Sequence, residues 1–177
     1  MTLDAILDDL ARSTSDVLGT LDDLSRTEWT WHPAPGAWSV SEIAEHTCTV
    51  QRGIERLFTT KMLEQPLTAE SPPPRWKDDE LIRMMADGGR KARAPEMVLP
   101  KGRWTTREEL ATAFTASTGA LTAWVRAQQV DLRAYGSIHP MLGMMDGVQW
   151  LVFVAAHTRR HAGQVRGVRE LYGKAAG

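Results

Sequence analysis

The stretch "AAHTRRHAGQV", residues 155–165, places two histidines in one predicted helix, and both the fold and the site can be worked out from it. His157 and His161 lie four residues apart, and four residues of α-helix turn by about 400°. Both imidazoles therefore lie on one face of the helix, one above the other. Val154 and Val168 extend this face at helical intervals. The spacing predicts a long amphipathic helix whose histidines point into an apolar interior.

Two segments in the first third of the chain carry the same helical pattern. Apolar residues recur at helical intervals over 3–25, with Asp, Arg and Ser between them. The next helix begins with a capping box, in which Ser39 is the N-cap and Glu42 reaches back to its amide. This second helix is predicted to continue to about Leu63, before Pro66.

Two more helices are predicted in the second half of the chain. The third has either Thr105 or Thr106 as its N-cap, with a glutamate three residues further on. The last begins near Gly147, with Asp146 as its N-cap, and runs to about Tyr172.

The connection between the second and third helices is long and irregular. Residues 66–103 contain the breakers "SPPPRW" and "GGRKARAP", and "DDELIRMMAD" between them is predicted to form a short helix. A connection of this length indicates a crossover that wraps the bundle or carries part of a site. With four long helices and no convincing strand, we expect an all-α fold, a four-helix bundle, in a single domain over residues 1–177.

Composition excludes several classes of protein. A formal net charge of -1 gives no electrostatic basis for binding nucleic acid. No run approaches the roughly 20 apolar residues of a membrane span, and the N-terminus is acidic where a signal peptide is basic. The one cysteine, Cys48, excludes an intramolecular disulfide and a cysteine-based zinc cluster. We therefore expect a cytoplasmic protein with no nucleic-acid or membrane partner.

A third histidine is predicted to face the same interior. His46 lies three residues after Ile43 and four before Val50, on the inward stripe of the second helix. Burying three imidazoles without partners would cost on the order of 1–3 kcal/mol each. A divalent ion satisfies them, since neutral imidazole binds zinc, nickel, cobalt and iron. Three protein ligands leave a position open, which is typical of a reactive site. The alternative is a helical interaction module whose histidines bind nothing.

Five other side chains have two interpretations each. Arg160 is either a solvent-facing charge or the group that orients an anionic thiol cofactor. Gln164 either donates to a metal-bound water or serves packing. His32 and His139 are predicted to bond to nearby backbone in their loops rather than to reach the site. Cys48 is predicted to be a buried structural residue.

Three segments resemble the DinB/YfiT-like superfamily of bacterial four-helix proteins. They are "AWSVSEIAEH" at 37–46, "HPMLGMMDGVQWL" at 139–151 and the opening stretch "AAHTRRHAGQV". The resemblance implies a four-helix bundle in which His46, His157 and His161 surround a divalent ion, often zinc or nickel. It also implies a homodimer, because members of this superfamily are often dimeric.

The superfamily includes thiol S-transferases that use bacillithiol, mycothiol or glutathione. We therefore expect a metal-dependent enzyme, a transferase or hydrolase, that activates a low-molecular-weight thiol or water for attack on a small electrophilic substrate. The alternative is a non-catalytic metal- or ligand-binding stress-response protein. The sequence identifies no general base, and the insert at 66–103 matches no one characterised subgroup.

Overall fold

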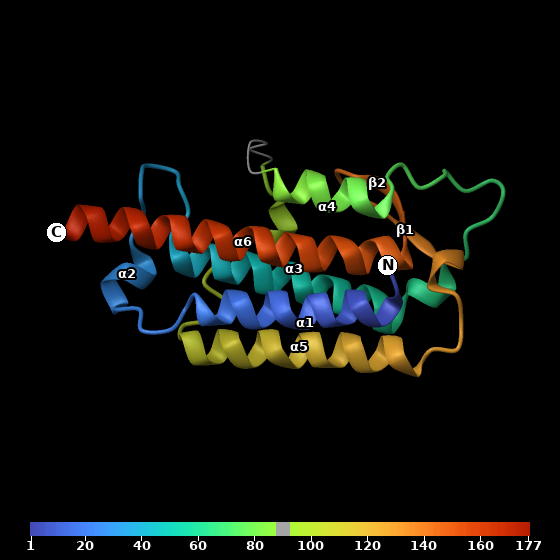
Figure 1. Ribbon diagram of the computed structural model, residues 1–177, viewed down its shortest axis with the longest axis horizontal. Coiled ribbons are helices and arrows are strands. Elements are labelled where there is room, and N and C mark those ends of the chain that lie inside the picture. Colours follow the sequence, from blue (N-terminus) through green and yellow to red (C-terminus); the bar gives the residue numbers. More distant parts are fainter. Residues whose placement is uncertain (88–92) are drawn as a thin grey trace.

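The computed structural model describes residues 1–87 and 93–177, so most of the predicted breaker "GGRKARAP" lies outside the described residues. Four long helices form a bundle (Figure 1). This is the predicted all-α, four-helix architecture. The four helices are α1 (Leu3–Gly19), α3 (Val40–Thr60), α5 (Arg107–Ala127) and α6 (Gly147–Ala176).

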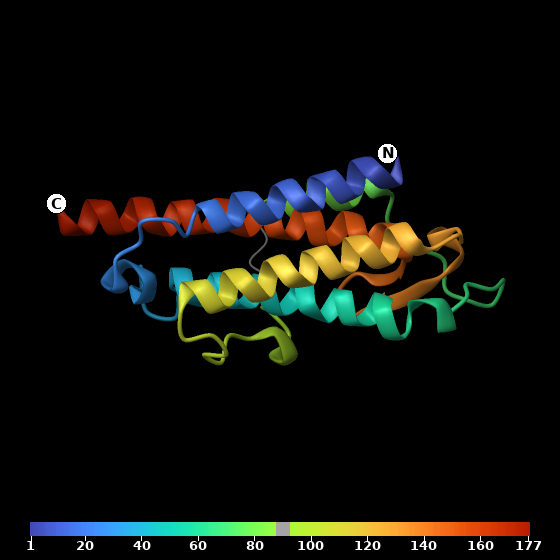
Figure 2. The same ribbon diagram turned by 90° about the horizontal axis from the view of Figure 1, so that it is seen from below.

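The first and last helices lie side by side and run in the same direction. Two ion pairs show this, because Arg159 pairs with Asp9 and Arg166 pairs with Asp16, an advance of seven residues on each helix. Seen from below, α1 and α6 form one layer and α3 and α5 form the other (Figure 2).

The helices α3 and α5 are also parallel, which explains the long crossover. Ser117 donates to Glu55, and further along the same direction the ring of Trp124 lies 5.7 Å from that of Phe58. After α3 ends, the chain must therefore run back along the length of the bundle before α5 can begin. The described residues of this return include the short helices η1 (Met62–Glu64), α4 (Asp78–Ala86) and η2 (Glu96–Val98). The predicted short helix is confirmed as α4, which packs on α6.

The predicted capping boxes are confirmed at three helix starts. Ser39 Oγ accepts from the amide of Glu42 at 3.3 Å, and its own amide donates to Glu42 Oε2 at 2.9 Å. Thr106 is the N-cap of α5, which resolves the choice between two threonines. Asp146 caps α6 in the same reciprocal manner. These side chains satisfy amides that have no partner within their helix.

The first helix is shorter than predicted. It ends at Gly19 rather than at residue 25, and a separate helix α2 (Arg26–Thr30) follows with Ser25 as its N-cap. Asp23 has a φ of 58°, in the left-handed region that a right-handed helix cannot contain. Leu24 is nonetheless buried. The spacing of the apolar residues therefore predicted correctly that Leu24 is buried, but not where the helix ends.

The expectation of no strand is wrong. A two-stranded antiparallel hairpin, β1 (Gly136–His139) and β2 (Gly143–Asp146), precedes α6 and follows a short helix η3 (Leu132–Ala134). Gly136 lies so close to Leu67 that an added Cβ would be 2.8 Å from the leucine Cδ2 atom. The hairpin therefore depends on a contact with the distant crossover, which its own four-residue strands do not reveal.

The bundle interior contains two apolar clusters separated by polar residues. The first cluster includes Leu10, Ile54, Leu121 and Val154, and the second includes Val17, Cys48, Phe114 and Val165. Between them every long helix contributes a buried polar side chain. We call this set the mid-bundle polar layer: Ser13, Thr14, Gln51, Ser117, Thr118 and Thr158.

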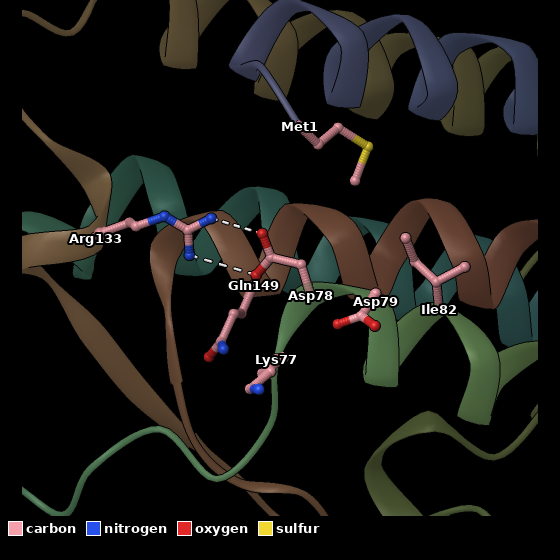
Figure 3. Close-up of a pocket in the computed structure, with 7 residues that line it drawn as sticks. All are labelled: Met1, Lys77, Asp78, Asp79, Ile82, Arg133 and Gln149. Atoms are coloured by element: carbon pink, nitrogen blue, oxygen red, sulfur yellow. Dashed lines mark hydrogen bonds and ion pairs between the residues drawn. The ribbon is translucent and has the colours of Figure 1, made fainter.

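An arginine joins the elements at the hairpin end of the bundle. Arg133 bonds to Asp78 at 2.6 Å and to Asp146 at 3.0 Å, and so connects the first residues of α4 with the N-cap of α6. Beside it is a surface hollow of about 470 Å³ (Figure 3). Within the described ranges, no helix is both long and apolar enough to cross a membrane.

Candidate metal centre

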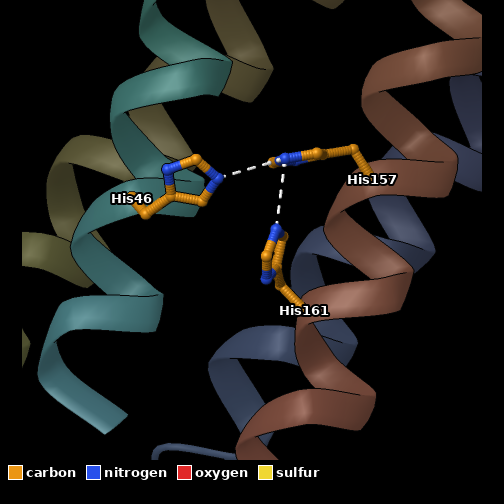
Figure 4. Close-up of side chains that lie close together, drawn as sticks. All are labelled: His46, His157 and His161. Atoms are coloured by element: carbon orange, nitrogen blue, oxygen red, sulfur yellow. Dashed lines mark hydrogen bonds between the residues drawn. The ribbon is translucent and has the colours of Figure 1, made fainter. Parts of the chain in front are cut away.

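Three histidine side chains from two helices meet at one point (Figure 4). His46 on α3 and His161 on α6 each direct Nε2 at Nε2 of His157, at 3.3 and 3.2 Å. The candidate ligand atoms of the three residues all lie within 4.8 Å of one another. Helical spacing puts His157 and His161 on one face of α6. The helix α3 runs in the opposite direction to α6 (Figure 2) and brings His46 opposite them.

Two of the three imidazoles have a defined tautomer. Nδ1 of His46 lies 2.9 Å from the carbonyl oxygen of Val98, and Nδ1 of His161 lies 2.8 Å from Oε1 of Gln164. A carbonyl or amide oxygen only accepts hydrogen bonds, so each Nδ1 must carry the proton. The Nε2 atoms of His46 and His161 therefore present lone pairs, both toward the same nitrogen of His157.

A proton on His157 cannot satisfy both lone pairs. Its Nε2 can donate to only one of the two facing nitrogens, and its buried Nδ1 has no partner among the described residues. A divalent cation satisfies all three nitrogens at once. Two nitrogens bound tetrahedrally at about 2.0–2.1 Å lie about 3.3–3.4 Å apart, close to the two short separations here. The residues present fit a divalent metal ion.

The electrostatics favour neutral imidazoles. Burial lowers the pKa of His46, although its bond to Val98 acts in the opposite direction. Burial, and then the neighbouring histidines, lower the pKa of His157 well below its usual value. Burial is also the largest cause that lowers the pKa of His161, to about 3. The three ligand atoms are therefore unprotonated at neutral pH, which is the form that binds a cation.

Comparison with known proteins places the chain in a family. A family model for the DinB superfamily matches residues 9–165. The chain belongs to the DinB superfamily. The protein YuaE of Bacillus subtilis (strain 168) is 19% identical to it over 150 residues, which cover 85% of this chain and 88% of YuaE.

Two solved structures share the fold of this DinB-superfamily chain. YfiT from Bacillus subtilis superposes with a TM-score of 0.67 at 14% identity, over 98% of this chain and 90% of YfiT. That protein is described as a probable metal-dependent hydrolase with an unusual four-helix bundle topology. The four-helix bundle protein TT2238 superposes with a TM-score of 0.60 at 18% identity, over 94% of this chain and 99% of TT2238.

The DinB bundle surrounds the histidines with aromatic rings. The ring of Trp38 lies 4.9 Å from that of His46, and the ring of Phe153 lies 5.3 Å from that of His157. These rings give the centre an apolar wall on each side, which strengthens electrostatic interactions within it. Trp38 also packs on the second apolar cluster, together with Trp29, Trp31 and Trp104.

The crossover supplies part of the site, which sequence reasoning left open. The carbonyl of Val98 in η2 accepts a hydrogen bond from His46, and the segment after Val98 is held by Glu45. The buried Glu45 carboxylate accepts from the amides of Lys101, Gly102 and Arg103 at 2.7, 2.8 and 3.2 Å. Burial is the largest single influence on Glu45 and raises its pKa. The three amide bonds and the Arg103 guanidinium together lower the pKa by more than burial raises it, so the net shift is downward.

The two predicted cofactor-binding residues have defined contacts. Gln164 lies beside the ligands but accepts from His161 rather than reaching across the centre. Arg160 donates to the carbonyl of Asp87 at 3.3 Å, at the C-cap of α4. Its role toward an anionic thiol stays a prediction. The neighbouring Arg159 pairs with Asp9 on α1.

The remaining candidates have the contacts that were predicted, backbone hydrogen bonds for the two loop histidines and burial for the cysteine. His139 accepts at Nδ1 from the amides of Met141 and Leu142, and His32 donates to the carbonyl of Ala37 at 2.8 Å. Cys48 is fully buried, and burial raises the pKa of its thiol to about 12. A thiol with that pKa stays protonated at neutral pH and is a poor ligand and nucleophile.

Proposed function

We propose that this DinB-superfamily protein binds one divalent metal ion, zinc or nickel, through Nε2 of His46, His157 and His161. We further propose that the bound ion makes it an enzyme that acts on a small electrophilic molecule. The observation that carries the proposal is the tautomer arrangement. Two Nε2 lone pairs, fixed by Val98 and Gln164, converge on a third nitrogen that cannot satisfy both by donating a proton.

The chain's own residues divide the remaining tasks. A divalent ion held by three imidazoles supplies Lewis acidity and brings the pKa of water or a thiol bound to it near neutrality. Val98 and Gln164 orient two of the imidazoles, and Trp38 and Phe153 keep the surroundings apolar. Arg160, one turn beyond His157, is the cation proposed to orient the anionic part of a thiol.

Metal analysis tests the binding proposal. Protein prepared without a histidine tag and supplemented with zinc, nickel and cobalt should contain about one equivalent of metal. The double variant His157→Ala/His161→Ala should lose it, whereas His32→Ala, at a loop histidine that bonds to the carbonyl of Ala37, should retain it. Less than about a tenth of an equivalent in the unmodified protein would contradict the proposal.

Turnover tests the catalytic part separately. Metal-loaded protein should consume an electrophile such as an activated ester, an epoxide or an aryl halide in the presence of water or one of a panel of low-molecular-weight thiols. The metal-free protein is the reference. One equivalent of bound metal without turnover above that reference would instead support a non-catalytic metal-binding protein.

A further inference from the structure

Two adjacent residues of α3 hold the same return segment of the crossover. His46 donates to the carbonyl of Val98, and Glu45 accepts from the three consecutive amides of Lys101 to Arg103. His46 is itself a candidate metal ligand, and Glu45 is the residue that precedes it in the helix. The contacts on the segment are three residues apart, so the two side chains fix a short length of backbone between them.

The segment is closed into a compact loop around the Glu45 carboxylate. Arg103 donates from one guanidinium nitrogen to Glu45 Oε1 at 2.9 Å and to the carbonyl of Leu99 at 3.1 Å. Gly102 has a φ of 71°, a left-handed conformation that lets successive amides point to one side. An added Cβ at this glycine would meet nothing within 4 Å, so backbone conformation, not space, requires glycine there.

This carboxylate is buried and fully engaged, which argues against a surface role. Glu45 is 5% exposed, and its two oxygens take four hydrogen bonds, three from backbone amides and one from Arg103. A buried carboxylate is stable only with such partners. Removing its charge would release the loop in which the carbonyl of Val98 is held.

We infer that Glu45 is a positioning residue for the metal centre: by holding the amides of 101–103 it places the Val98 carbonyl that sets the tautomer and orientation of His46. The inference rests on the proposed function insofar as it concerns metal affinity. Partners of this kind around ligating histidines typically change metal affinity by about 10–100-fold. Glu45 does not contact the ligand ring directly and acts through the backbone carbonyl of Val98. The change in metal affinity is therefore expected near the lower limit of that range.

The test compares two glutamates on one helix. Zinc affinity is measured by competition with a chromophoric chelator for the unmodified protein, Glu45→Gln and Glu42→Gln. Glu42 belongs to the capping box of α3 and bonds to Ser39, so its variant controls for general loss of helix stability. We expect Glu45→Gln to bind zinc about tenfold more weakly, and Glu42→Gln to remain within twofold of the unmodified protein. An unchanged Glu45→Gln, or an equal loss in both variants, would overturn the inference.

A second measurement separates this inference from the proposed function. Imidazole nitrogen NMR of the metal-free protein reports whether Nδ1 of His46 carries a proton. We expect a protonated Nδ1 in the unmodified protein and in Glu42→Gln, and a mixture of tautomers in Glu45→Gln. If the unmodified protein bound no zinc, the proposed function would fail, while this readout would still test Glu45.

A further variant covers the case in which Glu45→Gln does not fold. Gly102→Ala retains the carboxylate but strains the loop at its left-handed residue. It should weaken zinc binding in the same direction as Glu45→Gln, with the same appearance of mixed His46 tautomers. An affinity and a tautomer both equal to those of the unmodified protein would count against the inference.

Discussion

The Nδ1 atom of His161 donates to Oε1 of Gln164 at 2.8 Å, one turn further along α6. This bond keeps the Nε2 lone pair of His161 directed at the centre. An amide oxygen is a weaker acceptor than a carboxylate, and a stronger acceptor makes the ligand nitrogen more basic. Gln164 therefore tunes His161 as well as orienting it.

Replacing Gln164 should change metal affinity in a graded way. Gln164→Leu removes the acceptor and should weaken zinc binding about tenfold, whereas Gln164→Glu should bind at least as tightly as the unmodified protein. Chelator competition measures both. Gln128→Leu is the control, because that amide donates to Trp124 at the end of α5. Equal affinities for Gln164→Leu and Gln164→Glu would show that the acceptor has no influence.

A half-buried histidine that is not one of the three candidate ligands should make the metal-free protein sensitive to acid. Burial lowers the pKa of His139 to about 4, below the value of about 6.5 in the unfolded chain. As the pH falls below 6.5 the unfolded chain takes up a proton that the folded chain does not. Stability is therefore lost between about pH 7 and pH 4, by at most about 1.4 kcal/mol per pH unit for one fully buried histidine, and by less for this partly exposed ring.

The measurement is the free energy of unfolding in urea at pH 7.5 and 5.5, with a chelator present. The loss should be smaller in His139→Asn, which keeps an acceptor for the amides of Met141 and Leu142. His32→Asn, with its ring half-exposed, is the matched control. An identical loss in His139→Asn and the unmodified protein would be inconsistent with a lowered pKa at this residue.

The sequence predicted the histidines of the centre but not the groups that orient them. His46, His157 and His161 follow from helical periodicity, which fixes the face of each residue. Val98 was out of reach because it contributes a backbone carbonyl, which any residue provides. Glu45 was missed because its partners are amides of an irregular segment more than 50 residues away. Gln164 was singled out by its spacing, although for a different contact.

At the scale of helices and strands, the N-cap side chains differ in how many elements they hold together. Thr106 accepts from the amide of Glu109 at 3.1 Å on an exposed helix start. Asp146 accepts from the amide of Gln149 at 2.8 Å and also pairs with Arg133 at 3.0 Å, in a buried position between the hairpin and α6. The second cap therefore holds two elements together, whereas the first stabilises one helix.

Removing these caps should cost different amounts of stability. Thr106→Ala should lower the free energy of unfolding by about 1 kcal/mol. Asp146→Ala should lower it by about 2 kcal/mol or more, because it also removes a buried partner of Arg133. Urea unfolding of both variants measures the difference. A loss in Asp146→Ala no larger than that in Thr106→Ala would contradict the dual role.

Helix starts were predictable and helix ends were less so. Ser39, Thr106 and Asp146 form capping boxes within four residues of sequence, so local chemistry determines them. The end of α1 depends instead on the left-handed Asp23 and on packing that keeps Leu24 buried beyond the helix. The β hairpin depends on Leu67 from the crossover and an isolated pairing of Pro66 with Tyr135. Such long-range contacts leave no periodic signal.

At the scale of the whole molecule, α1 pairs in parallel with α6, and α3 with α5. All four helices contribute side chains to the mid-bundle polar layer. Thr14 bonds to Thr118 across it at 3.1 Å, and Ser117 bonds to Glu55 at 3.2 Å. Among the described residues, one apolar cluster lies on each side of this layer. A polar layer at one level favours a single register of the four helices, since a shifted helix would face these groups with apolar side chains.

One side chain of the mid-bundle polar layer, Gln51, is expected to stabilise the fold when it is replaced. Gln51 is fully buried, and neither end of its amide meets a hydrogen-bond partner within residues 1–87 and 93–177. A buried amide without a partner costs about 1–3 kcal/mol. Gln51→Met has a similar length and no polar atoms, so it should raise the free energy of unfolding by about 1 kcal/mol or more. Urea unfolding of the metal-free protein gives the value, with Gln65→Met in the crossover as the control. A decrease instead would mean that the amide is hydrogen-bonded in solution by an internal water.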